Sequence, residues 1–180
     1  MLVHLDGARL SNATAALGGT VAALRSFTVD AGVDVVSFGG TKAGLLGGEA
    51  VVYLDAALAQ RAKYVRKMVN QLPSKMRFVA AQFNALLDDD LWIKGAQHSN
   101  QMALQLYEAT RHIPGVEFDH APQVNSLFPQ LPADAIAALC DWCFFWDWDI
   151  SRRQVRWMTA WDTTADDVDR FAAGVCHLLG

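Results

Sequence analysis

The sequence lacks the features typical of secreted, membrane-spanning and nucleic-acid-binding proteins. Its 180 residues include only three cysteines, an odd number that argues against a disulfide framework. No apolar run approaches the roughly 18 residues of a membrane helix, and no signal-peptide pattern opens the chain. The 15 Lys and Arg residues are outnumbered by 19 Asp and Glu residues, so the basic face of a nucleic-acid-binding protein is not expected. We therefore predict a cytoplasmic protein without nucleic-acid or membrane partners.

The cysteines and histidines do not predict a metal site. Cys140 and Cys143 have the spacing of a redox or metal-binding pair, but no second pair accompanies them. They lie in the apolar stretch 135–146, so we expect buried, unreactive thiols. The five histidines are scattered along the chain without the spacing of metal ligands.

A glycine-rich loop with a single lysine is the first candidate for chemistry. Two β-branched runs, residues 33–38 and 50–54, predict buried strands, and Lys42 lies between them among glycines and two leucines. Desolvation in such a loop would lower the pKa of the lysine, which is what a Schiff-base amine requires. The alternative is a flexible loop whose lysine reaches water.

The second candidate is Asp6, at the end of a short apolar strand that precedes a helix starting near Leu10. Open parallel sheets bind ligands at the carboxyl ends of their strands, so Asp6 and Lys42 are expected at one crevice, joined by a helical crossover. An aspartate that keeps a pyridine nitrogen protonated and an amine that binds the aldehyde would suit pyridoxal phosphate. For Asp6 alone, a turn before Gly7 is the alternative interpretation.

The pattern predicts a division of the chain near residue 70, where Pro73 interrupts a helix and Ser74 can cap the next one. Residues 1–70 read as an α/β segment and the rest as a small α+β domain. In the first part we expect helices at 12–17, 20–30 and 56–69. In the second part we expect helices at 75–87, 91–110, 133–140 and 164–179, and strands at 116–118, 125–128, 144–148 and 154–159.

Two motifs carry a resemblance to a known family. HLDGARLSNA at residues 4–13, followed by DVVSFGGTKAG at 34–44, resembles the low-specificity threonine aldolases of the threonine aldolase and β-eliminating lyase family. Matching segments at 64–68, 74–78 and 155–159 extend the resemblance over essentially the whole chain. The sequence differs at Ala43, where many close relatives have asparagine.

The resemblance implies a fold-type I pyridoxal-phosphate enzyme, similar to aspartate aminotransferase. Residues 1–70 would be the C-terminal part of its large cofactor-binding domain, without the N-terminal half, and residues 71–180 its small α+β domain. The missing half would supply the turn that holds the cofactor phosphate and the histidines that take part in catalysis.

The resemblance also assigns roles to individual residues. Lys42 would be the catalytic lysine that binds pyridoxal phosphate, with Asp6 and Arg9 as further cofactor ligands. Lys67 and Arg77 would reach the cofactor phosphate of a neighbouring subunit in a homo-oligomer, a dimer or tetramer with shared sites. The alternative for this pair is a solvated basic helix end.

Arg156, with Arg9, would bind the substrate α-carboxylate. Arg156 lies in an alternating strand, where its guanidinium is costly to bury unless it faces an anion. An outward-facing arginine paired with an aspartate is the alternative.

The implied activity is cleavage of β-hydroxy-α-amino acids such as threonine into glycine and an aldehyde. A base must take the β-hydroxyl proton, and no residue of this chain is a convincing candidate. Three alternatives stay open: a non-catalytic fragment, a degenerate paralogue, or another β-eliminating lyase of the same fold.

Overall fold

The computed structural model describes residues 1–180, and the chain divides between Gly95 and Ala96, within helix α5 (Leu91–Thr110). The sequence predicted a division near residue 70. The later division has a physical reason, because aromatic side chains after residue 70 pack on the N-terminal sheet. The rings of Phe83 and Trp92 lie 5.9 and 5.8 Å from that of Phe38. Helix α4 (Met76–Leu87) therefore belongs with the N-terminal unit.

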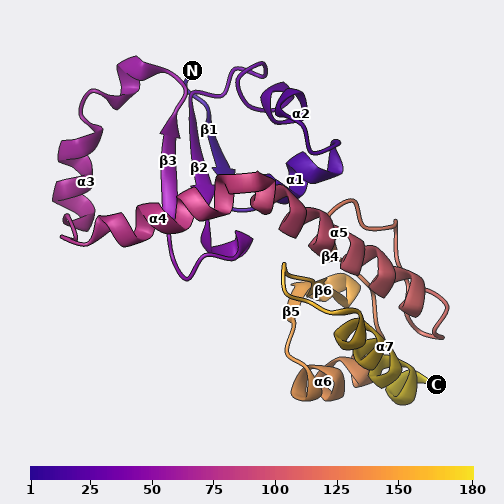
Figure 1. Cartoon of the computed structure of the whole chain (residues 1–180). Coiled ribbons are helices and arrows are strands. Elements are labelled where there is room, and N and C mark those ends of the chain that lie inside the picture. Colours follow the sequence, from indigo (N-terminus) through magenta and orange to yellow (C-terminus); the bar gives the residue numbers. More distant parts are fainter. The chain divides into compact units, whose positions relative to one another are not determined.

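The N-terminal unit is built on a three-stranded sheet in the order β1-β2-β3 (Figure 1). Strand β1 (His4–Gly7) pairs in parallel with β2 (Val35–Gly39), and helices α1 (Leu10–Ala16) and α2 (Val21–Ser26) form the crossover between them. Strand β3 (Glu49–Tyr53) returns antiparallel to β2. The helical crossover expected between Asp6 and Lys42 is thus present.

Strand β3 is not the buried strand that we predicted. Val51 and Val52 are 57% and 41% exposed, because β3 is an edge strand with a neighbouring strand on one side only. The predicted helix 56–69 is also interrupted, with a 3₁₀ turn η2 (Ala56–Ala59) followed by α3 (Ala62–Asn70). No residue of α3 is buried, and Figure 1 shows this helix standing apart from the strands.

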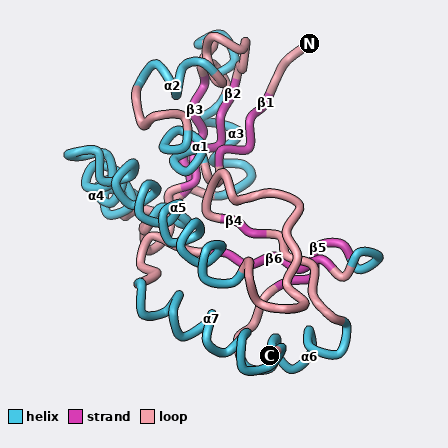
Figure 2. Tube along the Cα trace, turned by 90° about the vertical axis from the view of Figure 1, so that its right-hand side faces the viewer, coloured by secondary structure: helices cyan, strands magenta, loops and turns pink.

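The C-terminal unit, residues 96–180, packs helices against a second sheet, in the order β4-β6-β5 (Figure 2). Its strands are β4 (Ser126–Leu127), β5 (Trp146–Asp149) and β6 (Gln154–Met158), all antiparallel. Helices α6 (Ala133–Trp142) and α7 (Ala165–Leu179) and most of α5 supply the rest of its core. The core includes Leu106, Leu127, Leu139, Val155, Trp157 and Val175, all at most 5% exposed.

Two further predictions differ from the structure in this unit. Residues 116–118 form no strand, because only Glu117 pairs, through an isolated bridge to Gln130. Cys143, which follows the end of α6, and Cys176 of α7 are exposed, and only Cys140 is half-buried. Partial burial, together with the nearby Cys140, still raises the pKa of the Cys143 thiol, which favours its unreactive form.

No helix of the protein is both long enough and apolar enough to span a membrane.

Replacing Gly39 with alanine should destabilise the N-terminal unit. A Cβ at this position would lie 2.7 Å from the Ala8 Cα atom and 2.9 Å from its carbonyl oxygen, both backbone atoms that cannot move aside. We expect Gly39→Ala to lower the free energy of urea unfolding by about 2 kcal/mol. Gly47→Ala is the matched control, since a Cβ there meets nothing within 4 Å. Equal stability of the two variants would contradict the close approach.

The capping box of α7 predicts a specific dependence of stability on pH. Hydrogen bonds from the Thr164 hydroxyl and backbone lower the pKa of Asp167. The carboxylate therefore stabilises the fold above the ordinary aspartate pKa, and this contribution disappears as the pH falls through the lowered value. In Asp167→Asn, the melting temperature should therefore decrease less steeply as the pH is lowered. An unchanged slope in Asp167→Asn would contradict this role of the capping box.

Candidate active site

Two predicted residues, Asp6 and Lys42, lie at the carboxyl ends of β1 and β2 and so at the same end of the sheet. The strands run in parallel with Asp6 opposite Ser37 and Gly7 opposite Phe38, so both carboxyl ends point the same way. Asp6 lies at one end, and Lys42 follows the other by three residues, in the 3₁₀ turn η1 (Thr41–Ala43). Asp6 is exposed, and its Oδ1 accepts a hydrogen bond of 3.0 Å from the Ala8 amide. Asp6 therefore forms the turn that was its alternative interpretation. It still lies at the carboxyl end of β1, at the same end of the sheet as the Lys42 loop.

His4 and Ser37 lie on the same face of the sheet as Asp6. Side chains two residues apart in a strand share a face, and Ser37 is the direct neighbour of Asp6 in register. The His4 Nε2 atom is 2.8 Å from the Ser37 hydroxyl, which ties β1 to β2 just before the strand ends.

Hydrogen bonds within the Lys42 loop give it a defined shape. The Gly40 amide donates to the Gly48 carbonyl at 3.0 Å, and the Gly48 amide donates to the Thr41 hydroxyl at 3.2 Å. Gly44 ends the η1 turn with a φ of 112°, a conformation that favours glycine. The loop is therefore a closed turn between β2 and β3.

Lys42 is exposed, so the desolvation that we expected from its apolar neighbours is absent. Leu46 is 95% exposed and cannot shield the amine, and Leu45 turns inward toward Gly40 instead. Arg9 lies next to this edge, as the half-buried residue that precedes α1.

Lys67 and Arg77 are not at the strand ends. Lys67 lies in the last turn of α3 and Arg77 in the first turn of α4, and both are exposed. The Arg77 guanidinium lies 4.8 Å from the ring of its neighbour Phe78. Neither residue forms an ion pair with an acidic side chain of this chain.

Arg156 lies in the C-terminal unit, on β6 and opposite Trp146 of β5. It makes no ion pair with an aspartate, in contrast to the alternative that the sequence left open. Its Nε atom is buried without a hydrogen-bond partner, and its guanidinium carbon is 5.5 Å from the centre of the Trp148 ring. A guanidinium with unused donors is suited to bind a carboxylate.

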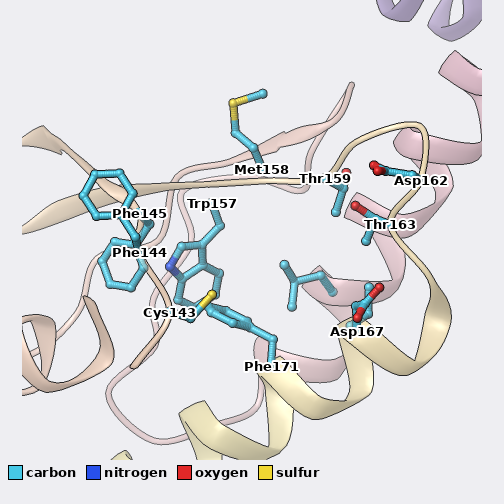
Figure 3. Close-up of a pocket in the computed structure, with 12 residues that line it drawn as sticks. Cys143, Phe144, Phe145, Trp157, Met158, Thr159, Asp162, Thr163, Asp167 and Phe171 are labelled. Atoms are coloured by element: carbon cyan, nitrogen blue, oxygen red, sulfur yellow. The ribbon is translucent and has the colours of Figure 1, made fainter. Parts of the chain in front are cut away.

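A cavity of about 320 Å³ in the same unit lies between β6 and the start of α7 (Figure 3). Its walls are mostly apolar, and four of the twelve lining residues are aromatic. Its two threonine hydroxyls form hydrogen bonds within the fold: Thr159 donates to the Ser99 carbonyl, and Thr163 accepts from the Ala160 amide. Figure 3 shows the indole nitrogen of Trp157 turned toward Phe144, away from Asp162 and Asp167. The cavity therefore presents no convergent set of polar groups.

One family model matches most of the chain. The model of the beta-eliminating lyase family matches residues 1–132. The chain belongs to this family. The match includes the Asp6 and Lys42 motifs and both helices that carry Lys67 and Arg77.

Two curated members of similar sequence are low-specificity L-threonine aldolases. The one from Pseudomonas aeruginosa is 40% identical over 180 residues, and one from another Pseudomonas is 41% identical over 175 residues. These alignments cover 99% and 96% of this chain but 51% and 49% of the relatives. The chain thus spans about half the length of the curated relatives it matches.

Solved structures confirm the predicted fold class. A threonine aldolase from Leishmania major matches the whole chain with a TM-score of 0.84 and 28% identity, over 52% of its own length. A lysine aminotransferase from M. tuberculosis matches 99% of the chain and 41% of its own length, with a TM-score of 0.57 and 18% identity. The second likeness concerns the fold alone.

Sequence reasoning missed the aromatic environment of Arg156. Trp148 was assigned only to a strand, because alternation within one strand does not reveal which side chain of the next strand lies over a given arginine. The signal available in the sequence was the density of aromatic residues at 144–148.

Removing the Thr41 hydroxyl should loosen the lysine loop. Thr41→Val keeps the shape of the side chain but leaves the Gly48 amide without its acceptor. We expect amide hydrogen exchange at Gly48 to become about fivefold to tenfold faster, as for the loss of one ordinary hydrogen bond. Thr41→Ser should retain the slow exchange. An unchanged rate in Thr41→Val would show that this bond does not restrain the loop.

Proposed function

We propose that the chain carries the lysine half of a pyridoxal-phosphate-dependent carbon–carbon lyase that cleaves β-hydroxy-α-amino acids such as threonine. The observation that supports this most is the parallel register of β1 and β2, with Asp6 and Lys42 at one sheet edge. Membership in the beta-eliminating lyase family and the names of the curated relatives agree with this chemistry.

The residues at the strand ends fit pyridoxal phosphate. An exposed primary amine can react with the cofactor aldehyde, and an aspartate on the neighbouring strand can face its ring nitrogen. Gly7, Gly39 and Gly40 keep side-chain bulk away from this edge. When bound, the cofactor supplies an electron-accepting ring that takes up the electron pair of the breaking Cα–Cβ bond.

Within this function, each residue has a separate task. The Lys42 Nζ atom holds the cofactor covalently, and the Asp6 carboxylate keeps the ring nitrogen protonated. Arg156 binds the substrate carboxylate through its guanidinium, and Arg9 assists it from the start of α1. Fixing the carboxylate fixes the orientation of the Cα–Cβ bond, which lowers the entropic part of the barrier.

We further propose that the active protein is a homo-oligomer in which Lys67 and Arg77 reach the cofactor phosphate of a neighbouring subunit. Both side chains are exposed and free of ion pairs within the chain, as such a role requires. Helix α3, which carries Lys67, also exposes apolar side chains: Tyr64, Met68 and Val69 are 64%, 77% and 67% exposed. Apolar surface of this kind is typical of protein contacts.

Covalent trapping tests the assignment of Lys42. The chain is incubated with pyridoxal phosphate, reduced with borohydride and mapped by peptide mass spectrometry. We expect one pyridoxyl group per chain on Lys42, and loss of this label in Lys42→Arg. Lys94→Arg is the control, because Lys94 is a surface lysine paired with Asp89 at 2.6 Å. Label spread over surface lysines would overturn the assignment.

Turnover of threonine tests the reaction class. We expect glycine and acetaldehyde as products, with Arg156→Lys raising KM at least tenfold, because lysine lacks the two-pronged guanidinium. Preferred turnover of a β-substituted alanine, with release of its β-substituent, would favour a β-eliminating lyase instead.

A further inference from the structure

Arg156 is held by an aromatic surface rather than by a carboxylate. Its guanidinium carbon lies 5.5 Å from the centre of the Trp148 ring, within the range of a cation–π contact. The other contact of that ring is with Phe128, whose centroid is 4.8 Å away. Phe128 is itself tied to β6, since the Gln154 side chain donates to its carbonyl at 3.1 Å. Phe128 thus packs against the Trp148 ring, and the Trp148 ring contacts the Arg156 guanidinium.

A β-bulge puts Trp148 in this place. The pairing of β5 with β6 shifts between Asp147 and Asp149, which lie opposite the consecutive residues Val155 and Gln154. Trp148 is therefore the extra residue of β5. Bulges turn one side chain away from the regular alternation and occur often beside active sites. Trp146, by contrast, keeps the regular position opposite Arg156, and its ring contacts Phe144.

This contact leaves the donors of Arg156 unused. In a cation–π contact the aromatic ring attracts the positive charge of the guanidinium, and the N–H groups stay available as hydrogen-bond donors. The Nε atom is buried and has no hydrogen-bond partner, a costly state in a folded protein unless a ligand supplies the acceptor. A carboxylate, with two acceptor oxygens in one plane, matches the planar N–H groups of a guanidinium.

We propose that Trp148 is a positioning residue that holds the Arg156 guanidinium ready for a carboxylate ligand. The inference deepens the proposed function, on which it rests, by naming the residue that orients the carboxylate-binding arginine. Trp148 touches neither the reacting bond nor the cofactor in this role. It acts through Arg156 alone, so its loss weakens carboxylate binding.

The side-chain Nε–Hε signal of Arg156 in ¹H–¹⁵N NMR spectra of the full chain tests this directly, with acetate as the probe. The signal is assigned by its loss in Arg156→Lys. In the native protein we expect it to be shifted upfield by the indole ring and to move on addition of acetate. Trp148→Ala should abolish the upfield shift and weaken acetate binding by about threefold to thirtyfold.

Two further variants separate positioning from folding. Trp148→Phe keeps an aromatic face and should restore most of the acetate affinity. Trp146→Ala removes the other tryptophan of the same strand, which is 69% exposed against 57% for Trp148, and should leave the Arg156 signal and the affinity unchanged. Backbone amide spectra show whether each variant is folded.

The inference is overturned if Trp148→Ala leaves the Arg156 signal and acetate affinity at native values, or if acetate never moves the native signal. These spectra require neither cofactor nor turnover. A failure of Lys42 labelling would overturn the proposed function and leave them unaffected, so the two failures are distinguishable.

Discussion

The parallel pairing of β1 with β2 is the constraint on which the candidate site depends. The strands end so close to the neighbouring backbone that a Cβ at Gly7 would lie 2.6 Å from the Ser37 carbonyl oxygen, and one at Gly39 would collide with Ala8. Only glycine permits this approach. Because the strands stay in register to their last residues, the Asp6 turn and the Lys42 loop begin at the same end of the sheet.

Lys42 in the N-terminal unit and Arg156 in the C-terminal unit are held by different means. Lys42 owes its place to backbone hydrogen bonds of its loop, which leave the amine exposed to solvent. Arg156 owes its place to aromatic rings, which restrict the guanidinium without neutralising it. Both arrangements keep the charged head available. An ion pair with an aspartate would fix either residue equally well but would occupy the donors that a ligand needs.

The sequence predicted the connectivity of the N-terminal sheet because strands, crossover and glycine-rich loop each have a local signature. It did not predict exposure correctly. Val51 and Val52 look like residues of a buried strand, but what covers a strand depends on elements elsewhere in the fold. The same reason explains the exposure of Lys42, since apolar neighbours in a loop need not fold over it.

Contacts between strands were beyond sequence reasoning for a related reason. The bulge at Trp148 is a property of the register between β5 and β6, and alternation within either strand does not encode it. The division at Gly95 depends likewise on where Phe83 and Trp92 pack. Pro73 marks the end of a helix, and it says nothing about which sheet the next helix covers.

The three-stranded N-terminal sheet has a consequence for handling the protein. Both outer strands, β1 and β3, have a free edge whose backbone groups can pair with another chain. On β3 this edge adjoins two exposed valines and carries a single charged residue, Glu49. Natural edge strands usually discourage such pairing with lysine, proline or a bulge. Either side of this sheet can therefore be extended by a strand from another polypeptide, and the β3 side carries little that would discourage it.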